Sequence, residues 1–453
     1  MADRFRVITG PPDVLTRHGD DLRRALTVAG QSRPPSVGFQ PEFALPDPSP
    51  RLRDFFSVVD LPFRRLGQVG GKELVFFDLM GNPGTRTAKT LASTVIVARA
   101  IRHIDRTGEP IVILTPSSAN KATALRDAVL RAYQTGLANP DSLRIVTLVP
   151  DAARPKLWSS ELTDDPALAA ANPMCVLAPG HPDHVKTVAL QALEMYSTEV
   201  YERTGARLWH TLDLANYRCA DAVRAFVEQT DLPLEPGRTR VHAHAVSSAF
   251  GLLGHHFGTT LLTDPPRSGY FLVQHLDTPD MVQSLHGISA PDYRFDPATG
   301  LYHQDVEPRY PATTFDPAEN LEATFYTRNP ATSPAMNRII EAQGGGGLVV
   351  SLHECLAGYG RVRALLGDAG ITLPADPRSL REWSLVMLLT GVLNAVDRGL
   401  VDADEIVMHA SGSYDASDYT PIPDRSLHPV GGVADLRLAI LDTAGVRSPR
   451  RVA

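Results

Sequence analysis

Lysine is rare in this chain, and one lysine stands where covalent chemistry is expected. Only five of the 453 residues are lysines, and arginine supplies 39 of the 44 basic residues. Lys89 ends the segment 82–89, with the sequence NPGTRTAK, which follows the apolar segment 74–77. A desolvated lysine can lose its proton and form a Schiff base, whereas an arginine stays charged. Lys89 is therefore a candidate for covalent catalysis, although a lysine at a helix start is more often an ordinary solvated side chain.

Two further loops carry small hydroxyl residues where a helix is predicted to begin. Residues 115–120 read TPSSAN after a predicted strand at 110–114, and residues 246–251 read VSSAFG after the apolar strand residues 241–245. Ligands of open parallel sheets bind beyond the carboxyl ends of the strands, and helix N-termini favour anions, although such residues also make plain helix caps. Two anion-receptive loops and a lysine fit pyridoxal 5′-phosphate (PLP) with an amino-acid substrate.

These loops belong to a pattern in which apolar strands alternate with helices from about residue 72 onward. The predicted strands are 73–77, 110–114, 143–149, 174–177, 239–246, 270–275, 348–351 and 405–410. The predicted helices between and after them are 90–106, 122–133, 183–204, 220–229, 251–256, 334–342, 352–366 and 380–399. This alternation predicts an α/β fold with parallel-rich sheets and right-handed crossovers.

The ordered series of motifs resembles the fold type II family of PLP enzymes, and the threonine synthases within it. The lysine segment is similar to the family's N-P-T-G-S-F-K-D run, but is one residue longer and lacks its Phe and Asp. The segment 117–120 is similar to the S-S-G-N loop, with alanine for glycine, and 247–251 partly matches the phosphate loop. Ser411 follows the last strand, where the family has a hydroxyl that meets the pyridine nitrogen. The similarity spans roughly residues 72 to 415.

The resemblance implies a set of site residues and a reaction class. It makes Lys89 the catalytic lysine, and it assigns the cofactor to Asn120, Ser247, Ser248, Phe250, Gly251 and Ser411, and the substrate to Thr115, Ser117 and Ser118. A neutral hydroxyl at the ring nitrogen favours β- or γ-elimination or replacement over transamination. We therefore expect a PLP-dependent lyase or replacement enzyme acting on an amino acid. The alternative is a catalytically silent relative that keeps the fold as a binding or scaffold protein.

A chain of this length predicts more than one domain. We expect an N-terminal arm at 1–55, a smaller α/β domain at 80–205, a larger α/β domain made of 56–79 and 206–430, and a C-terminal tail at 431–453. In the family that the chain resembles, the active site lies between the two domains, and the same is expected here.

The histidines suggest a metal site as an alternative to a PLP site. His242 and His244 alternate on a predicted strand and would share one face, and His255 and His256 follow in the next helix. Because no Asp or Glu stands nearby at ligand spacing, core histidines are the more common explanation, and we assign no metal ligand. A nucleotide-binding protein is disfavoured because no GxGxxG or GxxxxGK[ST] run follows a strand.

The composition of the chain excludes several classes of partner. A formal net charge of −7 gives no electrostatic case for binding nucleic acid or an anionic membrane. The three cysteines form no CxxC pair, which argues against a disulfide framework. The N-terminus lacks the apolar core of a signal peptide, and no segment is apolar enough to span a bilayer, so a cytoplasmic location is expected. The expected partner is a small amino-acid substrate, with a homodimer as the alternative partner.

Overall fold

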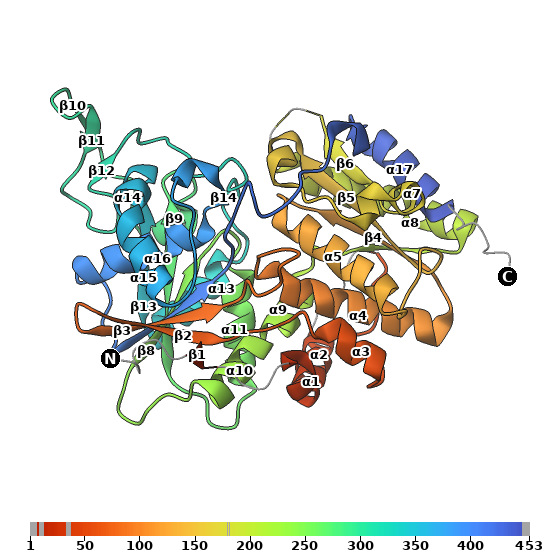
Figure 1. The fold of residues 1–453 in the computed structure, drawn as a ribbon, viewed down its shortest axis with the longest axis horizontal. Helices are drawn as coiled ribbons and strands as arrows, with labels where there is room; N and C mark the ends of the chain where they lie inside the picture. Colours follow the sequence, from red (N-terminus) through yellow and green to blue (C-terminus); the bar gives the residue numbers. More distant parts are fainter. Residues whose placement is uncertain (1–6, 9–12, 33–37, 179, 181, 446–453) are drawn as a thin grey trace. The chain divides into compact units, whose positions relative to one another are not determined.

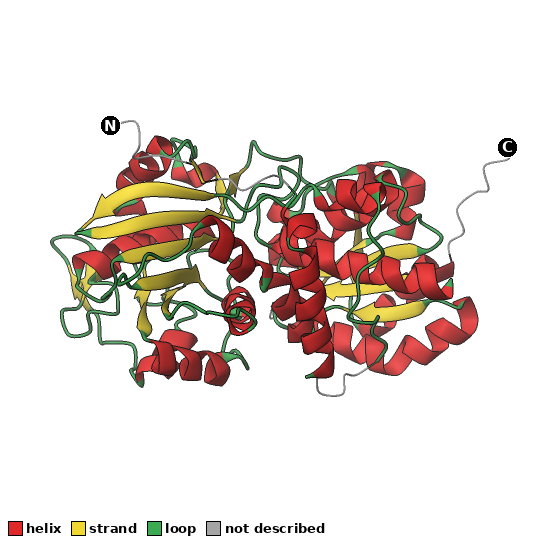
Figure 2. Ribbon diagram, turned by 90° about the horizontal axis from the view of Figure 1, so that it is seen from below, coloured by secondary structure: helices red, strands yellow, loops and turns green. Residues whose placement is uncertain are grey.

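Two compact units are formed by the residues that the computed structural model describes, which are 7–8, 13–32, 38–178, 180 and 182–445. Unit 1 takes its residues from 1–12, 61–81 and 224–417, and unit 2 takes them from 13–60, 82–223 and 418–453. Each unit contains a sheet with helices packed against it (Figure 1, Figure 2). The α/β class predicted from the alternating pattern is confirmed.

Unit 1 is built on a seven-stranded sheet. In spatial order its strands are β1 (Val7–Ile8), β2 (Phe63–Val69), β3 (Lys72–Asp78), β15 (Glu405–Ala410), β8 (Arg240–Ala245), β9 (Ser268–His275) and β13 (Gly345–Val350). β1, β2 and β3 pair antiparallel, and all further neighbours from β3 to β13 are parallel. The parallel part is the part that the sequence pattern predicted.

Strand alternation gives the sheet of unit 1 two different faces. On β8, Val241 and Ala243 pack against the apolar helix α16 (Ser384–Asp397) in a large hydrophobic core. The intervening His242 points to the face covered by α11 (Phe250–Thr260), where its ring contacts His255. The period-2 alternation of a strand therefore separates an apolar core from a layer of buried histidines.

The other elements of unit 1 follow the predicted order with local differences. They are α10 (Val223–Asp231), which begins in unit 2, α12 (Asp280–His286), β10 (Arg294–Asp296), β11 (Leu301–His303), β12 (Thr313–Thr314), α13 (Ser333–Gln343), α14 (Leu352–Ala357), α15 (Tyr359–Asp368), β14 (Leu380–Glu382) and β16 (Tyr414–Asp415). β10, β11 and β12 form a small sheet in the stretch predicted to be loop. The helix predicted at 380–399 begins only at Ser384, because the preceding residues pair with β16.

Unit 2 is built on a five-stranded parallel sheet. Its strands in spatial order are β17 (Leu427–Val430), β6 (Met174–Leu177), β5 (Leu143–Pro150), β4 (Ile111–Pro116) and β7 (Arg207–His210). Helices α8 (His184–Thr204) and α17 (Val433–Gly445) pack on one face, and α5 (Asn120–Gln134) packs on the other. α4 (Lys89–Thr107) lies against α5 and α9 (Leu214–Asp221).

Unit 2 also includes residues 13–60 and the described residues after 417, which cover most of the predicted arm and the predicted tail. Its N-terminal helices are α1 (Val14–Arg17), α2 (Gly19–Gln31) and α3 (Pro50–Phe56), and short helices α6 (Glu161–Asp164) and α7 (Pro166–Ala171) follow β5. α2 buries Leu22 and Leu26, and α17 buries Leu436 and Ile440. These helices join the unit because apolar residues spaced three or four apart give each of them a buried stripe.

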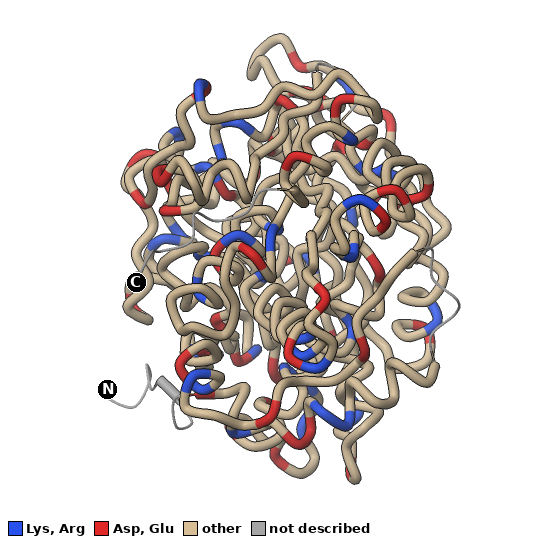
Figure 3. The backbone as a smooth tube through the Cα atoms, turned by 90° about the vertical axis from the view of Figure 1, so that its right-hand side faces the viewer, with Lys and Arg blue, Asp and Glu red and all other residues tan. Residues whose placement is uncertain are grey.

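Basic and acidic residues are interspersed along the backbone of the described residues (Figure 3). Mixed charge of this kind agrees with the modest net charge of −7. Within the described ranges, no helix has the length and apolar character needed to cross a lipid bilayer. The three cysteines are buried thiols.

Candidate cofactor and substrate loops

The loop that ends at Lys89 is held in shape by a buried asparagine. Asn82 accepts a hydrogen bond from the Gly84 N–H through Oδ1 at 2.9 Å, and its Nδ2 donates to Asp127 Oδ2 at 2.9 Å. A Cβ added to Gly84 would lie 2.7 Å from Asp127 Oδ1, so only glycine fits there without a shift. Asn82 Nδ2 also lies 3.3 Å from Thr90 Oγ1. The loop thus fixes the start of α4, whose first residue, Lys89, is exposed.

The loop after β4 enters α5 through an alanine in a backbone conformation that favours glycine. Ala119 has φ +144° and ψ −65°, and such a conformation costs a non-glycine residue on the order of 1–3 kcal/mol. The family that the chain resembles has glycine in this loop, so the backbone keeps a glycine-like path although the residue is alanine. Ser118 and Asn120, on either side, are partly exposed.

The three hydroxyl residues predicted to bind the substrate have different surroundings. Thr115 still lies inside β4, where it is fully buried and accepts a hydrogen bond from Thr211 Oγ1 at 3.2 Å. The prediction that placed it in the loop ended the strand two residues too early, and Thr115 belongs to the sheet. Ser117 is buried, and its Oγ accepts hydrogen bonds from the N–H groups of residues 119 and 122. Ser118 is the one of the three that reaches the protein surface.

Lys121, at the second position of α5, is an amine that the sequence pattern did not select. Burial, followed by the positive charges of Lys186 and Lys89, lowers its pKa to about 7. Lys186 forms an ion pair with Asp183 at 2.7 Å. Three of the five lysines therefore share one neighbourhood in unit 2. An amine that is about half neutral at pH 7 is a competent nucleophile. Its signal in the sequence was only its position directly after the serine-bearing loop.

The loop after β8 places two accessible hydroxyls at the start of α11. Ser247 is exposed, Ser248 is partly exposed, and Ala249 has φ +50° in the left-handed region. A Cβ added to Gly251 would lie 2.7 Å from Nη1 of Arg224, so a buried guanidinium rests against the first turn of this helix. The N–H groups of a helix start and a guanidinium both favour an anion. The sequence pattern did not identify Arg224.

Ser411 directly follows β15 and is partly exposed. The next residue, Gly412, lies against Glu382, because an added Cβ would be 2.9 Å from Glu382 Cγ. Glu382 is fully buried and accepts a hydrogen bond from the Ser384 N–H at 2.9 Å. A carboxylate therefore packs beside the segment where sequence reasoning expected only a hydroxyl.

Each unit has a loop whose groups suit one part of PLP or of an amino acid. α5 and α11 each follow an alanine at positive φ, and the first N–H groups of a helix point toward its N-terminal end. Arg224 adds positive charge at the start of α11. Phosphate and carboxylate groups suit such helix starts, and a lysine amine suits an aldehyde.

The architecture is that of the fold type II PLP-dependent enzymes. Solved structures similar to this chain include threonine synthase from Escherichia coli (14% identity, covering 95% of this chain and 91% of that chain, TM-score 0.55). PLP-bound threonine synthase from Brucella melitensis is similar at 12% identity (97% and 90% covered, TM-score 0.53). Diaminopropionate ammonia lyase from Escherichia coli is similar at 14% identity (92% and 95% covered, TM-score 0.50). At these identities the likeness shows the fold alone.

Within this fold the chain belongs to DUF6002, a family of unknown function, whose model matches residues 11–444. No curated protein matches the chain in sequence. The roles of the individual loop residues therefore depend on their own geometry and chemistry.

Proposed function

We propose that this protein is a PLP-dependent lyase or β- or γ-replacement enzyme that acts on an amino acid. The observation that carries the proposal is the set of three loops: Lys89 begins one helix, and two other helices begin after hydroxyl residues and a positive-φ alanine. The fold supports it, because the similar structures include a threonine synthase with bound PLP and an ammonia lyase.

Each loop has its own part in the proposal. Lys89 holds the cofactor through its amine and moves a proton at the α carbon of the amino acid. Ser118 and the first turn of α5 bind the substrate carboxylate, and Asn120 contacts the cofactor ring oxygen. PLP, when bound, supplies an electron sink for the bonds broken at the α carbon.

The phosphate belongs, in this proposal, at the start of α11. Ser247 and Ser248 donate hydroxyl hydrogen bonds, the N–H groups of Phe250 and Gly251 add two more, and Arg224 adds a positive charge. Charge-assisted hydrogen bonds to a phosphate are worth about 1.5–3 kcal/mol each. A loop with several of these donors is sufficient to retain the cofactor.

The reaction class follows from the partner of the pyridine nitrogen. A serine hydroxyl at Ser411 does not stabilise a protonated ring nitrogen as a carboxylate does. The ring then withdraws electrons less strongly, which favours elimination or replacement at the β or γ carbon over transamination. A carboxylate at the pyridine nitrogen would instead favour amino-group exchange, and the nearby Glu382 is the residue that could supply one.

Reduction of the cofactor onto the protein tests the lysine assignment. The purified protein is mixed with PLP, reduced with borohydride and digested, and the pyridoxyl peptide is sequenced. We expect a visible absorption band before reduction and the label on Lys89. Lys89→Arg keeps the charge but cannot form the covalent bond, so it should lose both signals, whereas the control Lys72→Arg should keep them. A label on Lys121 would overturn the assignment, and a colourless protein that binds no PLP would overturn the proposed function.

Separate substitutions of Ser117 and Ser118 distinguish substrate binding from stabilisation of the helix start. Ser118→Ala should weaken amino-acid binding while PLP binding stays unchanged, because its hydroxyl is accessible beside the start of α5. Ser117→Ala should instead lower the free energy of unfolding by about 1 kcal/mol, because it removes the oxygen that accepts two N–H groups. Calorimetric titration and urea unfolding of both variants distinguish these roles. Equal effects of the two substitutions on amino-acid affinity would contradict the assignment of Ser118.

A further inference from the structure

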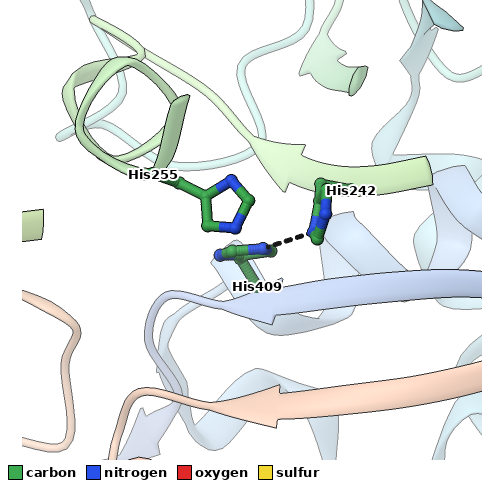
Figure 4. A group of neighbouring side chains, drawn as sticks. All are labelled: His242, His255 and His409. Atoms are coloured by element: carbon green, nitrogen blue, oxygen red, sulfur yellow. Dashed lines mark hydrogen bonds between the residues drawn. The ribbon is translucent and has the colours of Figure 1, made fainter. Parts of the chain in front are cut away.

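One face of the sheet in unit 1 carries a buried layer of histidines. β8 and β15 are parallel neighbours, and His409 pairs in register with His244. Because side chains alternate along a strand, His242 points to the same face as these two. α11 covers that face and adds His255 (Figure 4). All four rings are almost completely buried.

Three of these rings are close enough to share one ion. His242, His255 and His409 each offer a ring nitrogen, and these nitrogens lie within 4.8 Å of one another. His242 Nδ1 lies 3.0 Å from His409 Nε2 (Figure 4). Histidine binds metal ions through the lone pair of a ring nitrogen.

A carboxylate completes the group. Glu228, on α10, places Oε2 2.6 Å from His255 Nε2 and Oε1 3.4 Å from His242 Nε2. It stands 14 residues before His242 in the sequence, so no local spacing pattern reveals it. Zinc bonds of about 2.0–2.2 Å in a tetrahedron place neighbouring donor atoms roughly 3.4 Å apart. The two distances from Glu228, 2.6 and 3.4 Å, lie below and at that value.

The surroundings match those of a metal site. Tyr270 OH lies 3.0 Å from His255 Nδ1 and so orients that ring, as outer partners of metal-binding histidines do. Arg240 bridges Glu228 and Glu405 at 2.5 Å each. His242 Nε2 is fully buried, and it faces Glu228 Oε1 at 3.4 Å. A cation bound beside these two buried atoms would interact favourably with both.

The group also borders a cavity within unit 1. The cavity has a volume of about 320 Å³, and its lining includes Glu228, His242 and His255. The loop 233–237 and the segment 264–266 line its other parts. An ion therefore has a path to the histidines, which a metal site requires.

We propose that Glu228, His242, His255 and His409 bind a divalent transition-metal ion. Three imidazole nitrogens and one carboxylate oxygen suit zinc, and also copper, nickel or cobalt. Four protein ligands would fill a tetrahedral shell, so the ion stabilises unit 1 by joining α10, α11, β8 and β15. The site is independent of the proposed PLP chemistry, because none of its four ligands belongs to the cofactor loops.

Metal binding to the full chain provides the test. Protein treated with a chelator is dialysed against zinc, and the bound metal is measured by mass spectrometry; cobalt(II) is added separately to look for the intense visible bands of four-coordinate cobalt. We expect about one zinc ion per chain. We also expect the cobalt bands, and a melting temperature that rises with zinc and falls again with chelator. These measurements need no variant and no activity.

Substitutions locate the site. Glu228→Gln and His242→Gln should weaken zinc binding at least about tenfold. His256→Gln is the matched control, because His256 neighbours His255 on α11 but lies 3.4 Å from Gln343, outside the group. Circular dichroism shows whether each variant folds. Absence of bound zinc, cobalt bands and thermal shift in the unaltered protein would refute the site, as would equal loss of zinc in the His256 variant.

Discussion

Lys121 gives the sharpest test of the electrostatics of unit 2. Burial and the charges of Lys186 and Lys89 lower its pKa to about 7. At pH 7.5 about three quarters of such an amine is neutral, against about 0.1% for a lysine of ordinary pKa, a ratio of several hundred. Lys121 should therefore react far faster than exposed lysines with an amine reagent near neutral pH.

The assay is competitive labelling of all lysines over a range of pH, followed by mass spectrometry of the peptides. Because the chain has five lysines, each can be followed separately. The rate for Lys121 should reach its plateau above about pH 8, and Lys72, on the surface of unit 1, is the internal reference. Lys186→Met removes one neighbouring charge and should move the labelling midpoint of Lys121 upward. A midpoint near 10.5 in the unaltered protein would refute the reasoning.

The same depressed pKa has a consequence for stability. Between about pH 7 and 10.5 the unfolded chain holds the proton of Lys121 and the folded chain does not, so the unfolded state binds more protons. Stability from this group therefore rises with pH across that window and is lowest below pH 7, where the buried amine must be charged. Lys121→Met should remove the rise. Urea unfolding at several pH values measures it, and an unchanged slope in the variant would contradict the assignment.

Three further predictions concern the proposed cofactor loops. Ser248→Ala should weaken PLP retention by roughly tenfold, measured by equilibrium dialysis, and unchanged affinity would place the phosphate elsewhere. Ala119→Gly should raise the free energy of unfolding by about 1 kcal/mol, because relief of the strained φ exceeds the added chain entropy, and a loss of stability would show that the backbone is not strained. Ser411→Ala should lower elimination from amino acids with a β or γ leaving group, seen as keto-acid release. Fast amino-group exchange by the unaltered protein would point to Glu382 at the ring nitrogen instead.

The parallel strands and the long helices were predictable because their signals are local. Buried parallel strands are continuous apolar runs, and β4 and β5 differ from their predicted ranges by only one or two residues at their ends. β7 was not predicted, since its four residues, Arg207–His210, mix charged and apolar side chains. β2 was missed for the same reason, because two arginines and a glycine interrupt its apolar pattern. Strands that lack a continuous apolar run are defined by their partners rather than by their own residues.

The candidate sites were predictable only as far as they are contiguous in sequence. The serine-bearing loops follow strands directly, so the pattern located them. Arg224 and Glu382 reach the same loops from other elements, and Glu228 reaches His242 from α10. These contacts depend on how elements distant in the sequence pack against one another, for which the chain gives no local signal.

The backbone conformations of Ala119 and Ala249 bear on whether the loops before α5 and α11 bind ligands. Ala119 and Ala249 stand immediately before α5 and α11, and each holds a backbone conformation in which a non-glycine residue is disfavoured. Such strain costs on the order of 1–3 kcal/mol at each position and persists only where the surrounding structure fixes it, most often at binding sites. A silent scaffold would be more stable with relaxed loops at both places. The strained path at the N-termini of both helices therefore favours a protein that binds anionic groups there over one that only keeps the fold.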